Sequence, residues 1–118
     1  MQDLKLIKQI IDDRCITINE RNYNLTPTTH ERRVKVLAFF TKIQKQLTDG
    51  DFTFLVDKDY REVEKILTDC TLYENGILTK EVNHWEKFPE DFLIYVTNML
   101  VVISYPFLQG KTMNLPKE

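Results

Sequence analysis

The densest apolar run of the chain, FLIYVTNMLVVISY, lies at residues 92–105. Pro89 precedes it and suits a first helical turn, where the missing N–H costs nothing, and two carboxylates follow at the positive end of the helix dipole. Pro106 cannot continue the backbone hydrogen bonding, so we expect the helix to end there. Apolar residues lie all round this helix, which predicts burial on most sides.

Helical spacing of apolar residues predicts two long helices in the first half of the chain. The first runs from Asp3 to about Glu20, and the asparagines that follow it favour a turn. The second has a clear start, because Thr28-Thr29-His30-Glu31 fits a capping box with threonine at the cap and glutamate three residues later. It runs to about Thr48, and Gly50 lies near its C-terminal end.

The segment after Gly50 begins with the apolar stretch Phe52–Val56, which predicts a short strand or an extended segment laid over the core. Asp57 is the expected N-cap of a third helix, in which an apolar stripe recurs at helical spacing. We expect this helix to end somewhere between Asp69 and Asn75.

The dipeptide Asn75-Gly76 lies between apolar pairs and fits two structures. It is a strong hairpin signal, and it is equally the end of a helix. The short flanks favour the helix end. A short helix at 80–87 is expected to follow, with Val82 and Trp85 facing inward.

These elements predict a mainly α fold, a compact bundle of four to five helices around a buried central helix at about 90–105, with at most one short strand or hairpin. The 118 residues suit a single helical domain, 1–118, with a loose tail at about 111–118. A hydrophobic content of 42% with a net charge of −2 argues against overall disorder. The central run is too short, and too interrupted by Pro106, for a membrane span of about 20 residues, so we expect no membrane association.

The sequence contains no specific catalytic or metal-binding pattern. His30 lacks the second histidine of a zinc helix, and the H-x-E triplet at His84 lacks the downstream P-C-x-x-C of a zinc deaminase. Cys15 and Cys70 are too far apart to form a close ligand pair, and two cysteines with no secretory signal predict a cytoplasmic protein with reduced thiols. The sequence therefore predicts neither an enzyme nor a bound cofactor or metal.

Charge is divided unevenly between the two parts of the chain. Residues 1–50 hold nine Lys/Arg against six Asp/Glu, a balance of +3, and residues 51–118 hold seven against twelve, a balance of −5. A solvated helix face with capping carboxylates is the simpler interpretation. The sharper one is an acidic surface for a basic partner, with tyrosines as aromatic anchors. The residues of this predicted surface are Asp57, Asp59, Tyr60, Glu62, Glu64, Asp69, Tyr73 and Glu74.

These features predict a small cytoplasmic protein-binding protein. Its most concrete form is an immunity- or antitoxin-like inhibitor of a basic, nuclease-type toxin, a class with this general profile, although no motif here carries a family match. The alternative is a nucleic-acid-binding regulator that uses the basic face of the second helix, Lys35, Lys42 and Lys45. A pI near 5.7 makes nucleic acid the weaker alternative. A homodimer through the seam of Asn98 and Tyr105 is a further possibility.

Overall fold

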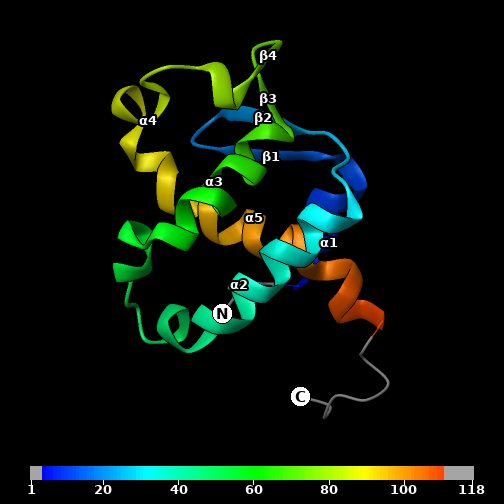
Figure 1. The fold of residues 1–118 in the computed structure, drawn as a ribbon. Coiled ribbons are helices and arrows are strands. Elements are labelled where there is room, and N and C mark those ends of the chain that lie inside the picture. Colours follow the sequence, from blue (N-terminus) through cyan, green and yellow to red (C-terminus); the bar gives the residue numbers. More distant parts are fainter. Residues whose placement is uncertain (1–3, 111–118) are drawn as a thin grey trace.

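The structure, a computed structural model, describes residues 4–110 (Figure 1). The α-helices are α1 (Leu4–Asp13), α2 (His30–Thr48), α3 (Lys58–Asp69), α4 (His84–Lys87) and α5 (Pro89–Gly110). The strands are β1 (Cys15–Ile18), β2 (Arg21–Leu25), β3 (Thr71–Tyr73) and β4 (Gly76–Ile77), and two 3₁₀ helices are η1 (Thr53–Val56) and η2 (Leu78–Lys80). The predicted loose tail lies outside the described residues.

The predicted central helix is confirmed as α5, which runs through the molecule with α1, α2 and α3 around it and the sheet above (Figure 1). Tyr95, Val96 and Leu100 are completely buried at 0% exposure. Pro89 occupies the first turn as expected. None of the helices within residues 4–110 has both the length and the apolar character needed to cross a membrane.

The prediction that Pro106 ends this helix is wrong, because α5 continues through it to Gly110. A proline inside a helix removes the hydrogen bond to the carbonyl four residues earlier. In the same part of α5, the carbonyl of Ile103 accepts from Arg33 Nη1 of α2 at 3.2 Å.

The second and third helices are confirmed as α2 and α3. The capping residue of α2 is Thr29, one position later than predicted, and its hydroxyl accepts from the backbone N–H of Arg32 at 3.2 Å. The stretch predicted as strand or extended is the 3₁₀ helix η1, in which Phe54 is buried. Val82, expected to face inward, is 78% exposed.

The first predicted helix is wrong beyond Asp13, where α1 ends and the hairpin β1–β2 begins. Asn19 and Glu20 form its turn with φ values of 49° and 69°, the left-handed backbone that a two-residue hairpin loop requires. Ile16, Ile18 and Tyr23 are buried on the inner face of this hairpin. These residues alternate with exposed ones, as in a half-buried strand.

The second hairpin, β3–β4, decides the ambiguity at Asn75-Gly76 against a helix end. Its turn is Glu74-Asn75, with φ values of 50° and 72°, and Gly76 pairs with Tyr73. The two hairpins form one antiparallel sheet in the order β1-β2-β3-β4. The expectation of at most one short strand or hairpin is therefore wrong, while the mainly helical fold is confirmed.

Candidate functional site

The carboxylate of Asp91, in the first turn of α5, is completely buried and accepts four hydrogen bonds. Its Oδ1 accepts from Asn19 Nδ2 at 2.7 Å and from Arg21 Nη2 at 3.0 Å. Its Oδ2 accepts from Arg21 Nε at 2.7 Å and from the Tyr23 hydroxyl at 2.8 Å. Burial raises the pKa of Asp91, but these hydrogen bonds and the guanidinium charge outweigh it and lower the pKa to about 2. Asp91 is therefore a buried anion held by the β1–β2 hairpin.

The strand geometry explains why three polar groups converge on one carboxylate. Asn19, Arg21 and Tyr23 lie two residues apart, at the turn and along β2, so their side chains share one side of the hairpin. Arg21 is held further by Glu90, whose Oε2 lies 2.6 Å from Nη2, and its guanidinium lies 4.0 Å from the ring centre of Phe88.

Tyr23 extends this network to His84 in α4. The Tyr23 hydroxyl lies 2.8 Å from His84 Nε2 and donates its single proton to Asp91, so Nε2–H of His84 must be the donor in the contact with Tyr23. Burial lowers the pKa of His84, against the pull of Asp91, so the imidazole is neutral near pH 7. No hydrogen bond between described residues involves Nδ1, which is therefore left as an available acceptor.

An aromatic cluster packs around this chain of polar groups. The ring of Tyr23 lies 5.2 Å from Tyr73 and 5.6 Å from Tyr95, measured between centroids. The His84 ring makes edge contacts at 4.7 Å with both Tyr73 and Trp85. Burial raises the pKa of the Tyr23 hydroxyl well above its usual range, with the Asp91 carboxylate adding to it, so Tyr23 remains protonated. The buried members of the network, Tyr23, His84 and Asp91, are thus enclosed by aromatic rings.

A cleft of about 490 Å³ opens beside His84, between α3 on one side and the η2–α4 segment on the other. Its wall combines apolar, hydroxyl and charged side chains: Leu55, Tyr60, Arg61, Glu64, Lys65, Thr68, Leu78, Thr79, Glu81, His84 and Trp85. Tyr60 is 2% exposed, and its hydroxyl has no hydrogen-bond partner among the described residues. The cleft is of a size found in ligand sites, and its lining is more polar than is usual for them.

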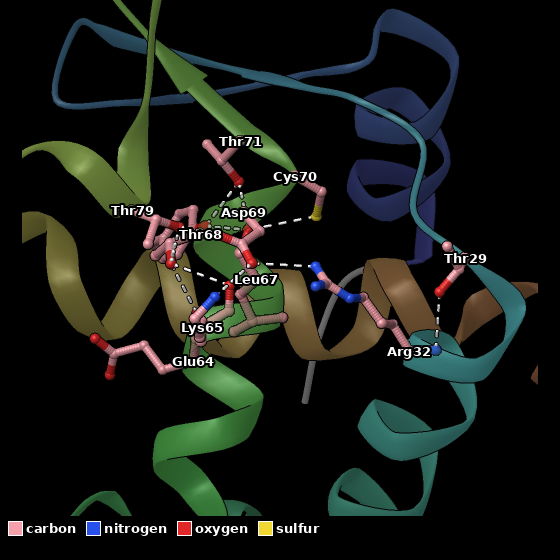
Figure 2. A network of polar contacts seen from close by, with 11 residues as sticks. Thr29, Arg32, Glu64, Lys65, Leu67, Thr68, Asp69, Cys70, Thr71 and Thr79 are labelled. Atoms are coloured by element: carbon pink, nitrogen blue, oxygen red, sulfur yellow. Dashed lines mark hydrogen bonds and ion pairs between the residues drawn. The ribbon is translucent and has the colours of Figure 1, made fainter.

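Asp69 holds one wall of this cleft in place (Figure 2). Its carboxylate accepts from Thr79 at 2.6 Å, from Arg32 at 3.1 Å and from Lys65 at 3.2 Å, which ties α3 to η2 and to α2. Burial acts to raise the pKa of Asp69, but the hydrogen bond from Thr79 and the two cations lower it overall. The Thr79 hydroxyl, whose single proton goes to Asp69, also lies 2.8 Å from the Thr68 hydroxyl, so the two threonines that line the cleft are held close together.

The structure distributes the predicted partner-binding residues over three settings. Asp57, Asp59, Glu62 and Glu74 are exposed, and Glu64 lies at the cleft. Asp69 is instead engaged within the chain. Tyr60 cannot be an exposed anchor, because it packs against Phe39 and Phe54 in the core, and Tyr73 is half-buried against His84.

The basic strip predicted on the second helix is partly neutralised. Lys42 pairs with Asp59 and Lys45 with Asp49, each at 3.2 Å, and these exposed pairs reduce the positive charge that nucleic acid would meet. The seam predicted for a homodimer is also reduced, since Asn98 is 6% exposed and only half-buried Tyr105 reaches the surface.

The residues of the buried network were missed by sequence reasoning. Asp91 was assigned only to the helix dipole, and Arg21 lies 70 residues away from it. The alternation of Asn19, Arg21 and Tyr23 was the available signal, and it has meaning only once the hairpin is known. Within residues 4–110, no three His, Cys, Asp or Glu side chains gather in a way that could hold a metal ion.

Comparison with known proteins gives no relative: no family model, no curated protein and no solved structure matches this chain.

Proposed function

We propose that this chain binds a partner protein and that the cleft beside His84 receives a basic segment of that partner. Residues 51–86, which build the cleft, carry nine Asp/Glu against four Lys/Arg, a balance of −5. The observation that carries the proposal is the pair Glu64 and Glu81, two cleft-lining carboxylates that make no ion pair between described residues. Each is placed to accept from a guanidinium or ammonium group.

The cations of the cleft do not cancel these carboxylates. Lys65 is engaged by Asp69 at 3.2 Å, which leaves Arg61 as the one lining cation that has no ion pair within residues 4–110. Two carboxylates therefore face one such cation, and the exposed acidic residues of α3 extend the negative charge outside the cleft. Such complementarity raises the association rate and the specificity for a basic partner.

Exposed apolar side chains next in sequence to lining residues favour a protein partner over a small cation. Val56 is 81% exposed and follows the lining residue Leu55, while Val82 is 78% exposed and follows the lining residue Glu81. The half-buried indole of Trp85 lines the cleft, and it can stack on an arginine or lysine side chain. Tryptophan is among the residues enriched at the energetic centres of protein interfaces.

The narrower form of the proposal is inhibition of a basic, nuclease-type toxin. It is supported only by the small domain and the acidic balance of the second half, and it stays a prediction. The same experiment tests it, because a captured nuclease can be assayed directly for inhibition.

The test is an affinity capture from native lysate at low and at high salt, in which the captured proteins are identified by mass spectrometry. Three proteins are compared: wild type, the cleft variant Glu64→Gln/Glu81→Gln, and the matched control Glu20→Gln/Glu31→Gln. Each captured protein is then purified and titrated while the fluorescence of Trp85, the only tryptophan, is recorded. We expect one basic protein that changes Trp85 emission, with a dissociation constant at least tenfold weaker for the cleft variant and unchanged for the control.

Equal binding by the cleft variant and wild type at low salt would overturn the placement in the cleft. Capture of nucleic acid alone, lost when Lys35 is replaced, would overturn protein binding in favour of the alternative on α2.

A further inference from the structure

A second cavity, of about 440 Å³, lies among α1, the connector after β2, α2 and α5. It shares no lining residue with the cleft beside His84. The proposed partner binding does not involve this cavity.

The interior of this cavity is apolar. Ile11 of α1, Leu25 of β2, and Met99, Val102 and Ile103 of α5 form its walls. These side chains come from three elements that pack together in the core. A preformed apolar cavity of this size accommodates a small hydrophobic group.

The cations that line the cavity have no carboxylate partner in the part of the chain that the structure describes. Lys8, Arg14 and Arg33 all contribute to its lining, and none of them makes an ion pair between described residues. Within residues 4–110, the one hydrogen bond that their charged groups make is from Arg33 Nη1 to the Ile103 carbonyl at 3.2 Å. Asp12 is the one carboxylate in the lining, so the balance is +2.

The backbone around the cavity is held in a defined geometry. Arg14 connects α1 to β1 with a φ of 54°, a left-handed conformation that is uncommon for arginine. Its carbonyl accepts from the N–H of Leu25, and the N–H of Thr26 donates to the carbonyl of Cys70, both at 2.8 Å. The cavity is therefore built before any ligand binds, which lowers the entropic cost of binding.

We propose that this cavity binds an amphiphile, a small molecule with one apolar chain and one anionic head. The chain enters between Ile11, Met99 and Ile103, and the head, a carboxylate or a phosphate, lies against Lys8, Arg14 and Arg33. Charge-assisted hydrogen bonds from guanidinium groups to such a head are strong and directional.

The test uses decanoate as the probe, with decyl phosphate and uncharged decanol as the other arms, all below their micelle concentrations. Binding is measured by calorimetry and located by methyl chemical shifts. The variant is Lys8→Gln/Arg14→Gln, which keeps Arg33 and its hydrogen bond to α5. The matched control removes two exposed lysines elsewhere, Lys35→Gln/Lys58→Gln, and thermal unfolding verifies that both variants are folded.

We expect saturable binding of one anionic amphiphile per chain, with shifts confined to Ile11, Leu25, Met99 and Ile103. Decanol and the Lys8/Arg14 variant should each bind at least tenfold more weakly, and the control should match wild type. The tighter of decanoate and decyl phosphate identifies the head. Equal affinity for decanol and decanoate, shifts spread over the surface, or no binding by any arm would overturn the proposal.

Discussion

Replacing Asp91 by asparagine should destabilise the protein by about 2–4 kcal/mol, because the substitution leaves buried donors without an acceptor. Each carboxylate oxygen accepts from two donors, at 2.7 to 3.0 Å. An amide can replace only one of the oxygens, and its NH₂ group then faces donors. A buried donor left without an acceptor costs about 1–3 kcal/mol, and removing one partner of a buried ion pair costs about 3–5 kcal/mol.

The pKa of Asp91 gives an independent figure. Lowering it from 3.8 to about 2 corresponds to roughly 2.5 kcal/mol of stability at neutral pH. This is an upper figure, because the Arg21 side chain is 21% exposed and solvent screens the pair. Since the folded pKa lies below the unfolded value, the contribution is complete above about pH 4 and is lost as the pH falls from there towards 2.

The assay is equilibrium unfolding in urea at pH 7, monitored by the fluorescence of Trp85. The ring of Trp85 lies 5.3 Å from that of Phe92, which is in α5 with Asp91. The matched control is Glu90→Gln, which removes a carboxylate that pairs with the same guanidinium but is 53% exposed. It should cost less than about 1 kcal/mol. A loss below about 1 kcal/mol for Asp91→Asn, or a loss equal to that of the control, would refute the reasoning. The difference in unfolding free energy between Asp91→Asn and wild type should also become smaller towards pH 2, and a constant difference would refute the reasoning as well.

Three further substitutions test other parts of the structure. Tyr60→Phe should be neutral or stabilise by up to about 1 kcal/mol in urea unfolding, because it removes a buried hydroxyl that has no partner among described residues; a clear loss would contradict this. Glu20→Gly should stabilise by about 0.5–1 kcal/mol, since Glu20 has a φ of 69° in the turn of the first hairpin, and a lower midpoint would contradict the turn geometry. Burial lowers the pKa of His84 below 6.5, so the unfolded chain takes up this proton more readily, and wild type should lose stability as the pH falls from 7 to 5. The His84→Gln variant should lose measurably less stability over the same range.

The helical part of the fold could be predicted because its signals are local. Apolar residues recur at helical spacing through α2, α3 and α5, and Thr29, Gly50 and Pro89 mark ends within a few residues of those found. Such signals do not depend on what lies elsewhere in the chain. The extension of α5 beyond Pro106 was not predictable, because a proline is itself a local signal for a helix end.

The sheet could not be predicted for the opposite reason. Cys15 and Ile18 continue the spacing of α1, so the first strand satisfies a helical pattern and a strand pattern equally. At the second hairpin the flanks are two or three residues long, and the turn is Glu74-Asn75 rather than Asn75-Gly76. Short strands obtain most of their stability from neighbours distant in sequence, and β2 pairs with β3 across more than 40 residues.

The cleft and the buried network form one unit, because α4 cannot hold its own position. A helix of four residues has almost no intrinsic stability, so His84 and Trp85 lie where their contacts place them. Those contacts are ring packing against Tyr73 and the hydrogen bond from His84 to Tyr23, a residue 61 positions earlier in the chain. Tyr23 in turn is oriented by Asp91, so a single hydroxyl connects the first hairpin, the start of α5 and the wall of the cleft. If a partner binds the cleft, we therefore expect it to stabilise the hairpin as well, and a substitution that loosens the hairpin should weaken the partner's binding.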